Sequence, residues 1–265
     1  MKKTIAVAAT LAIGGVGGYA LVSGEPAAAG AEGHCEVAEY AMGLRWQQQS
    51  AEAMALQGQT YALATQQLEK VVQQASKGRS GKLREDLAII TDLDETAIDN
   101  SALLARDLEN CHDYSTWDTW DHWEREGDPT LIHGALDFFK RADELGVHIY
   151  YISDRTEANL DDTLADLQRL GLPQAVEDQV LLLGPPKEER RAAVESEHRV
   201  VMQLGDTMHD FDAAYAGSDL ETQRELVQQQ ADKFGREWFV LPNPTYGSWS
   251  KATLESWDVE PNEGR

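Results

Sequence analysis

The stretch that decides the fold is residues 87–96, L-A-I-I-T-D-L-D-E-T. Its first half is a continuous apolar and β-branched run, which is typical of a parallel strand buried on both faces. Asp92 and Asp94 follow directly. Because side chains two residues apart in an extended segment share a face, both carboxylates should project together from the end of this strand. The carboxyl ends of the strands are where open α/β sheets bind their ligands.

Four further short runs have the same apolar, β-branched or aromatic character, and the intervals between them have helical patterns. These runs are His148–Ile152, Val180–Leu183, Val200–Leu204 and Trp238–Leu241. A repeated strand–helix–strand order predicts right-handed crossovers and an open, mostly parallel sheet flanked by helices. The predicted fold class is therefore α/β, with a Rossmann-like sheet.

Two segments lie outside this pattern. Residues 36–76 are proline-free and helical in character, and residues 101–129 are rich in Trp, Asp and His and predict an insertion over the sheet edge. In the first segment the apolar residues recur roughly at helical spacing, which predicts packing helices: Ala41, Leu44, Trp46, Ala51, Met54, Leu56, Tyr61, Leu63 and Leu68. We expect one domain over residues 30–265: a core of about 82–100 and 130–250, and mainly helical cap elements of about 35–80 and 101–129.

The amino terminus is typical of an export signal. Lys2 and Lys3 precede an apolar run from Thr4 to Val22, and residues 27–29 are three alanines suited to cleavage. The expected signal is residues 1–29, and the expected location is periplasmic or secreted. The apolar run is also about as long as a membrane span, so a retained membrane anchor is the alternative. No stable membrane partner is expected once the signal is cleaved.

The composition is strongly acidic. Asp and Glu number 46 against 23 Lys and Arg, for a net charge of −23, while 42% of the residues are hydrophobic. Such a chain has the material for a core, but it lacks the basic character of proteins that bind nucleic-acid polymers or anionic membranes. Most of the acids are expected to be solvated surface groups.

Cys35 and Cys111 are the two cysteines of the chain. Neither lies in a C-x-x-C or Cys/His array, which disfavours zinc. In an oxidising compartment they could pair, and two unpaired thiols are an equal alternative, since two cysteines make no disulfide framework.

Polar groups also follow three later strands, in the order Ser153, Lys187, and the pair Asp206 and Asp210 in G-D-T-M-H-D. Four strand ends therefore deliver an acid pair, a hydroxyl, an amine and a second acid pair. In a parallel sheet these ends meet at one edge. We expect them to form a single site.

This constellation resembles the signature of the haloacid-dehalogenase-type phosphohydrolases. The resemblance is closer to the class C, four-aspartate bacterial acid phosphatases, and it covers roughly residues 35–255. The motifs that carry it are R-W-Q-Q-Q-S-A-E at 45–52, I-I-T-D-L-D-E-T-A-I-D-N-S at 89–101, S-T-W-D-T-W at 115–120, L-G-D-T-M-H-D-F at 204–211 and L-P-N-P-T-Y-G-S-W at 241–249.

Phosphomonoester hydrolysis needs a nucleophile, proton delivery and neutralisation of charge on the phosphoryl oxygens. Asp92 suits the nucleophile, with an aspartyl-phosphate intermediate, and Asp94 suits the general acid and then base. Ser153 is expected to donate to the phosphoryl oxygens and Lys187 to offset their charge. Arg190 and Arg191 are alternative candidates for the charge-neutralising role given to Lys187. The competing interpretation is that both are surface arginines.

Carboxylates so close together repel one another unless a cation is present, and a hard ion such as Mg²⁺ fits their oxygens. The resemblance implies that this metal is held by Asp92, the backbone carbonyl of Asp94, and Asp206, with Asp210 as a ligand or directly behind the ligands.

For substrate recognition, the resemblance favours Tyr246. Asn100 is present at the position where the family has it, and we expect it to contact the substrate or to orient the nucleophile loop. Trp117, Trp120 and Trp123 lie in the insertion and could stack on a flat leaving group. For at least two of the three tryptophans, packing within the cap is the competing interpretation, and Trp117 is retained as the substrate contact. A tyrosine usual in the family is replaced here by a leucine, at position 103.

The expected function is an exported, Mg²⁺-dependent acid phosphatase acting on small phosphate monoesters, such as nucleoside monophosphates, with a homo-oligomer left open. The alternatives are a dehalogenase or phosphomutase on the same scaffold, and a non-catalytic periplasmic binding protein. Asp94 speaks against a dehalogenase, which does not need the second acid.

Overall fold

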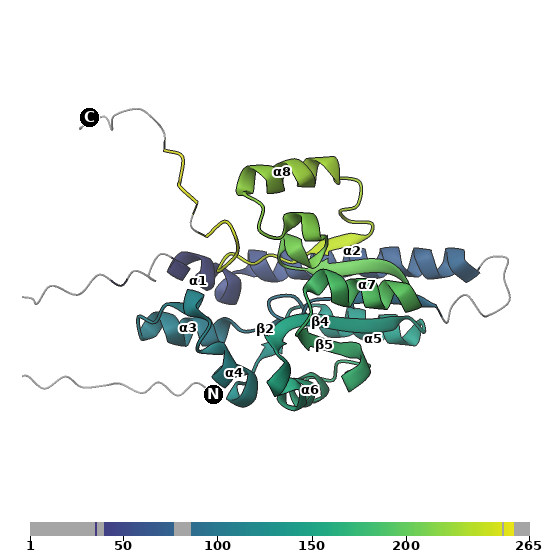
Figure 1. The fold of residues 1–265 in the computed structure, drawn as a ribbon, viewed down its shortest axis with the longest axis horizontal. Helices are drawn as coiled ribbons and strands as arrows, with labels where there is room; N and C mark the ends of the chain where they lie inside the picture. The colour runs from purple at the N-terminus through teal and green to yellow at the C-terminus, as the bar shows by residue number, and fades with distance from the viewer. Residues whose placement is uncertain (1–34, 36–39, 77–85, 251, 257–265) are drawn as a thin grey trace, which may run out of the picture. The chain divides into compact units, whose positions relative to one another are not determined.

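A five-stranded parallel sheet with the order β5-β4-β1-β6-β7 forms the centre of the protein (Figure 1). The computed structural model describes residues 35, 40–76, 86–250 and 252–256, and the expected export signal lies outside them. The strands are β1 Leu87–Thr91, β4 His148–Thr156, β5 Val180–Leu183, β6 Arg199–Gly205 and β7 Trp238–Val240. Each overlaps a run predicted from the sequence, although β4 continues past the predicted end at Ile152 and includes Ser153. The predicted α/β class is confirmed.

Helices cover both faces of this sheet. They are α1 Ala41–Gln49, α2 Ala51–Ser76, α3 Ser101–Glu109, α4 Trp120–Glu126, α5 Ala135–Glu144, α6 Leu160–Arg169, α7 Lys187–Glu197 and α8 Leu220–Gln229. The central strand β1 shows why two covers are needed. Its residues Leu87 and Ile89 belong to the main core with α2 and α5, whereas Ala88 and Ile90 belong to a second cluster with Val194 of α7. Alternate side chains thus point to opposite helical layers.

Helix α2 is part of the core and not of a cap, which differs from the expected domain division. Its buried residues include Tyr61, Leu68 and Val72, which pack in the main cluster with the sheet. Four apolar residues expected to pack are exposed instead, because they lie off this buried face: Ala51, Met54, Leu56 and Leu63. The Tyr61 hydroxyl donates to the backbone oxygen of Thr96 at 2.7 Å, which ties α2 to the loop after β1. Among the described helices, 26-residue α2 included, none has both the length and the apolar character of a membrane span.

The segment between residues 101 and 129, which the sequence predicts to be a cap, is mainly helical. A short antiparallel pair, β2 Ile98–Asp99 with β3 Thr130–Leu131, closes its base, and α3 and α4 lie between them. Helix α1 packs on α3 at this end of the molecule (Figure 1).

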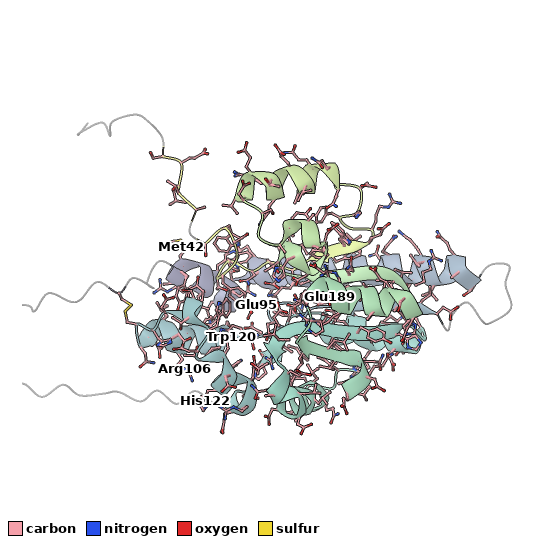
Figure 2. All side chains as sticks on the ribbon, in the orientation of Figure 1. Met42, Glu95, Arg106, Trp120, His122 and Glu189 are labelled. Carbon is pink, nitrogen blue, oxygen red and sulfur yellow. A yellow bond between two sulfur atoms is a disulfide. The ribbon has the colours of Figure 1, made fainter. Side chains whose placement is uncertain are left out.

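A disulfide joins Cys35 to Cys111, with a Cα–Cα distance of 5.6 Å and a sequence separation of 76 residues. It is the yellow bond at the left of Figure 2. Of the two alternatives that the sequence left open, the structure therefore has the paired form, which fastens residue 35 to the cap just after α3.

Candidate active site

The first acid pair lies on a tight loop that follows β1. The backbone N–H of Asp92 donates to the oxygen of Leu204 at 3.0 Å, which joins the loop to the end of β6. Glu95 then turns the chain with a φ of 56°, an unusual value for a residue with a side chain. Its N–H donates to the Ile98 oxygen at 2.8 Å and closes the loop. The loop thus holds Asp92 and Asp94 at the carboxyl edge of the sheet.

Lys187 connects the two acid pairs. It stands at the first turn of α7, and its Nζ lies 2.8 Å from Oδ1 of Asp92 and 2.6 Å from Oδ1 of Asp210. All three side chains are at most 10% exposed. The lysine that the sequence singled out is therefore the one that reaches the nucleophile candidate.

Asp92, Asp206 and Asp210 form a cluster suited to a cation. Each offers one oxygen, and the three oxygens lie within 4.8 Å of one another. Burial raises the pKa of Asp206 well above its ordinary value, and the charges of Asp210 and Asp92 raise it further. One ammonium beside three crowded carboxylates leaves an excess of negative charge. This all-oxygen donor set fits a divalent cation.

The second acid pair depends on a glycine. Oδ2 of Asp210 accepts hydrogen bonds from the backbone N–H and the hydroxyl of Thr207, both at 2.9 Å. A Cβ atom on Gly205 would lie 2.4 Å from the Cβ of Asp210, closer than such atoms approach in real proteins. The glycine of the G-D-x-x-x-D motif is therefore required for Asp210 to fold back toward the sheet.

Asp94 is not among the residues of this cluster and is held by three donors. Its Oδ1 accepts from Nδ2 of Asn100 and Nε of Arg155, both at 2.9 Å, and its Oδ2 accepts from the Ser153 hydroxyl at 3.0 Å. Arg155 is 1% exposed. Ser153, expected to donate to a phosphoryl oxygen, donates here to Asp94 and is itself fully buried.

Asn100 lies behind Asp94 and has no exposed surface. Its Oδ1 accepts from Nε1 of Trp123 at 2.8 Å and from a guanidinium nitrogen of Arg155 at 3.1 Å. Its backbone N–H donates to Glu95 at 3.0 Å. Asn100 is thus placed to act on Asp94, and not on a molecule in the cavity.

A cavity of about 900 Å³ opens over these groups. Asp92, Asp94, Lys187 and Asp206 line one part of it, and Trp117, Trp120 and Tyr246 line another. The ring of Tyr246 meets Trp117 edge to face with centroids 5.5 Å apart. The site therefore combines a charged floor with an aromatic wall, and the wall includes two residues, Trp117 and Tyr246, that the sequence singled out.

The family is decided by the comparison with known proteins. Residues 26–249 match the model of the HAD superfamily, subfamily IIIB (Acid phosphatase). The chain belongs to this family.

Two solved structures are similar to this acid phosphatase over most of its length. The class C acid phosphatase from Bacillus anthracis is 30% identical, with a TM-score of 0.77 over 85% of this chain and 100% of that chain. The structure described as this enzyme with tungstate bound is 31% identical, with a TM-score of 0.75 over 85% and 94% of the two chains. The resemblance found in the sequence is thereby confirmed, and the chain is a phosphoric monoester hydrolase that acts on small phosphate esters.

Of the three tryptophans between residues 101 and 129, two pack against neighbouring side chains, which is the competing interpretation to a substrate contact. Trp120 is 7% exposed and Trp123 bonds to Asn100, whereas Trp117 is 50% exposed at the cavity. Leu103, where the family has a tyrosine, is buried in the cluster beneath the aromatic wall.

Arg190 and Arg191 are neither surface residues nor part of the cavity lining. A guanidinium nitrogen of Arg190 donates to the backbone oxygens of Ser153 at 2.6 Å and Leu181 at 2.9 Å. Arg191 donates to those of His209 and Asp210. Arg190 thus supports strands β4 and β5 and Arg191 the turn after β6, because buried carbonyl groups need donors.

The sequence did not single out the contacts of Arg155, Glu95 and Asn243. Arg155 stands two residues after Ser153 on the same strand, so the period of two could have found it. The Tyr246 hydroxyl donates to Glu95, and burial raises the pKa of Glu95 to about 8. Asn243 donates to Oδ2 of Asp206 at 2.8 Å. No local pattern reveals these last two pairings, which join distant segments.

Burial also raises the pKa of Asp92, to about 7, although Lys187 acts in the opposite direction. Two permanent cations, Arg155 and Lys187, line the cavity together with six carboxylates: Asp92, Asp94, Asp121, Glu124, Asp154 and Asp206. A bound divalent cation would offset this charge and favour the ionised form of Asp92.

Proposed function

We propose that this acid phosphatase is an exported, Mg²⁺-dependent enzyme that hydrolyses small phosphate monoesters through an aspartyl-phosphate on Asp92. One observation carries the proposal: Asp92 lines the cavity together with Asp94, is in contact with Lys187, and shares an oxygen cluster with two further carboxylates. This arrangement supplies a nucleophile, charge neutralisation and a separate proton donor.

In the first step an oxygen of Asp92 attacks the phosphorus atom. The new bond joins that oxygen to phosphorus, and the bond from phosphorus to the ester oxygen breaks. Asp94 gives its proton to the leaving oxygen, which departs as an alcohol. Lys187, 2.8 Å from Asp92, offsets charge on the phosphoryl oxygens.

In the second step water attacks the phosphorus atom of the aspartyl-phosphate. Asp94, now ionised, accepts a proton from this water, and the bond between phosphorus and the Asp92 oxygen breaks. Inorganic phosphate leaves, and Asp92 and Asp94 return to their starting states. The hydrogen bonds from Asn100, Ser153 and Arg155 keep the Asp94 carboxyl in one orientation through both steps.

Mg²⁺ is the cation that we propose for the cluster. Asp92, Asp206, Asp210 and the backbone carbonyl of Asp94 are the proposed ligand groups. When bound, the ion stabilises negative charge on the transferring phosphoryl group. The similar Bacillus anthracis enzyme has a structure with tungstate bound, and tungstate is a tetrahedral oxyanion like phosphate, which supports a phosphoryl group as the ligand of this acid phosphatase.

The aromatic wall supports esters with a flat leaving group, such as nucleoside monophosphates. Trp117 is half exposed at the cavity, and Tyr246 packs against it edge to face. Flat groups gain from stacking on such rings.

Export of this acid phosphatase is supported by the residue pattern at 1–29 and by the disulfide, which is stable in oxidising compartments. Sequencing the amino terminus of the protein recovered from the periplasm or medium tests it. A chain that begins near residue 30 is expected, and an intact chain in the membrane fraction would favour the anchored alternative.

The catalytic proposal is tested by a panel of nucleoside monophosphates, sugar phosphates and p-nitrophenyl phosphate, with released phosphate as the readout. We expect release that EDTA abolishes and Mg²⁺ restores. A phosphomutase would return the phosphoryl group to substrate, and a binding protein would release none. Full activity of Asp92→Asn would refute the nucleophile assignment.

A further inference from the structure

The indole of Trp123 reaches from the cap to the residue behind the proposed general acid. Its Nε1 donates to Oδ1 of Asn100 at 2.8 Å, and Arg155 donates to the same oxygen at 3.1 Å. With its oxygen facing two donors, the amide of Asn100 must present its NH₂ group on the other side. There Nδ2 donates to Oδ1 of Asp94 at 2.9 Å. The chain of contacts thus runs from Trp123 through Asn100 to Asp94.

The helix that carries this indole is fixed to the strand that carries the other donors. Oε2 of Glu124, the next residue of α4, accepts from the backbone N–H of Thr156 at 3.0 Å and from Nδ2 of Asn159 at 2.8 Å. Thr156 is the last residue of β4, which also bears Ser153 and Arg155. Helix α4 and strand β4 are therefore joined by hydrogen bonds, and each supplies one donor to Oδ1 of Asn100.

We propose that Trp123 is a positioning residue for the phosphatase reaction: through Asn100 it holds the Asp94 carboxyl in the orientation that transfers a proton to the leaving oxygen. This inference rests on the proposed role of Asp94 as general acid. Trp123 does not touch the substrate or the reacting atoms. Its contribution lies in the direction of one hydrogen bond and in the alignment of the carboxyl that receives it.

Two substrates with different leaving groups separate positioning from general damage. An alkyl phosphate such as glycerol 2-phosphate needs its leaving oxygen protonated, whereas p-nitrophenolate leaves without a proton. The quantity to measure is kcat/KM, because it reports the steps up to the first phosphoryl transfer. Trp123→Phe keeps an aromatic ring and removes the N–H donor. We expect a loss of about five- to ten-fold for glycerol 2-phosphate, the value of one hydrogen bond, and less than about two-fold for p-nitrophenyl phosphate.

Asp94→Asn is the reference for this selective loss. If Asp94→Asn lowers kcat/KM equally for both esters, the acid role itself fails and the inference falls with it. If Asp94→Asn is selective and Trp123→Phe is not, the acid role stands and the positioning role of Trp123 is refuted. Trp46→Phe, on α1 and outside the cavity lining, is the matched control and should keep the wild-type ratio.

Competitive inhibition by inorganic phosphate checks that the site is intact. Its inhibition constant should be unchanged in Trp123→Phe, and a weakened constant with equal loss for both esters would show a merely structural role. Where Trp123→Phe does not fold, Asn100→Leu tests the next contact of the same chain. It keeps about the volume of Asn100 and removes the donor to Asp94 without adding a carboxyl beside it, so it should show the selective loss. An unselective loss in that variant would overturn the proposal.

Discussion

Nζ of Lys187 lies 2.8 Å from Oδ1 of Asp92, although the two residues are 95 positions apart in the chain. The same ammonium lies 2.6 Å from Oδ1 of Asp210. One buried ammonium thus pairs with both the proposed nucleophile and a member of the second acid pair. These two ion pairs connect the segments that follow β1, β5 and β6.

Replacing Lys187 by methionine should therefore impair catalysis strongly. Without the ammonium the phosphoryl oxygens lose a neutralising charge, so kcat/KM for p-nitrophenyl phosphate should fall about 100- to 1,000-fold. Lys140→Met, on the exposed face of α5, is the control and should retain wild-type activity. Comparable activity in the two variants would contradict the role assigned to Lys187.

Gly205→Ala should lower both stability and activity. Its new Cβ would clash with Asp210, so the turn must shift, at a cost of about 1–3 kcal/mol in the free energy of unfolding. The displaced carboxylate should also raise the Mg²⁺ concentration needed for half-maximal activity. Gly184→Ala is the matched control, because the nearest atom to its Cβ is 3.9 Å away. A Mg²⁺ titration of activity and urea unfolding measure both effects.

Removing the cation should destabilise the wild-type protein but not Asp206→Asn. The pKa of Asp206 is raised well above its ordinary value by burial and by Asp210 and Asp92, so its ionised form is costly without a counter-charge. Wild type should gain about 2.7 kcal/mol at a Mg²⁺ concentration 100 times its dissociation constant. Asp206→Asn, which lacks one of the three carboxylates, should gain much less and be inactive. Thermal unfolding with EDTA and with increasing Mg²⁺ checks this, and an equal gain in both proteins would refute it.

The Cys35–Cys111 disulfide should contribute about 2–4 kcal/mol to the free energy of unfolding, since it closes a long loop. The double variant Cys35→Ser, Cys111→Ser should unfold at a lower urea concentration than wild type. Dithiothreitol should lower the wild-type midpoint to that of the variant and leave the variant unchanged. A wild-type midpoint that dithiothreitol does not move would show that the bond adds no stability.

Lowering the pH should reduce the free energy of unfolding through protonation of His198. Burial and the neighbouring His148 lower the pKa of His198 below the unfolded value of 6.5, and the rings lie 4.4 Å apart. A histidine with a lowered folded pKa contributes stability that is fully present above the unfolded pKa and is lost as the pH falls through the folded one. His198→Gln, which still offers Tyr150 an oxygen acceptor, should show a flatter loss of stability between about pH 7 and 5. His122→Gln, at an exposed position, is the control. Parallel curves for wild type and His198→Gln would contradict the prediction.

Much of this architecture was readable from the sequence. The strands are continuous apolar runs, and Asp92, Asp94, Asp206 and Lys187 all follow directly on such runs or on the turns after them. Local pattern carries this information because a strand's end fixes where the next side chains point.

The remaining features depend on contacts between distant segments. Trp123 and Asn100 are separated by 23 residues, and no periodicity links an indole to an amide. Ser153 was expected to face the substrate, but Asp94 accepts its hydroxyl, which the sequence has no means of showing. Helix α2 was misassigned to the cap, because its apolar pattern reveals that it packs but not on which partner.

The disulfide has a further consequence for the chain's connectivity. Residues 35 to 111 form a closed covalent ring, and Asp92 and Asp94 both lie inside it. A protease that cuts this ring once would leave two chains that the disulfide still joins, one of which carries the proposed catalytic loop. Such a nicked enzyme would migrate as one species in a gel without reductant and as two with it.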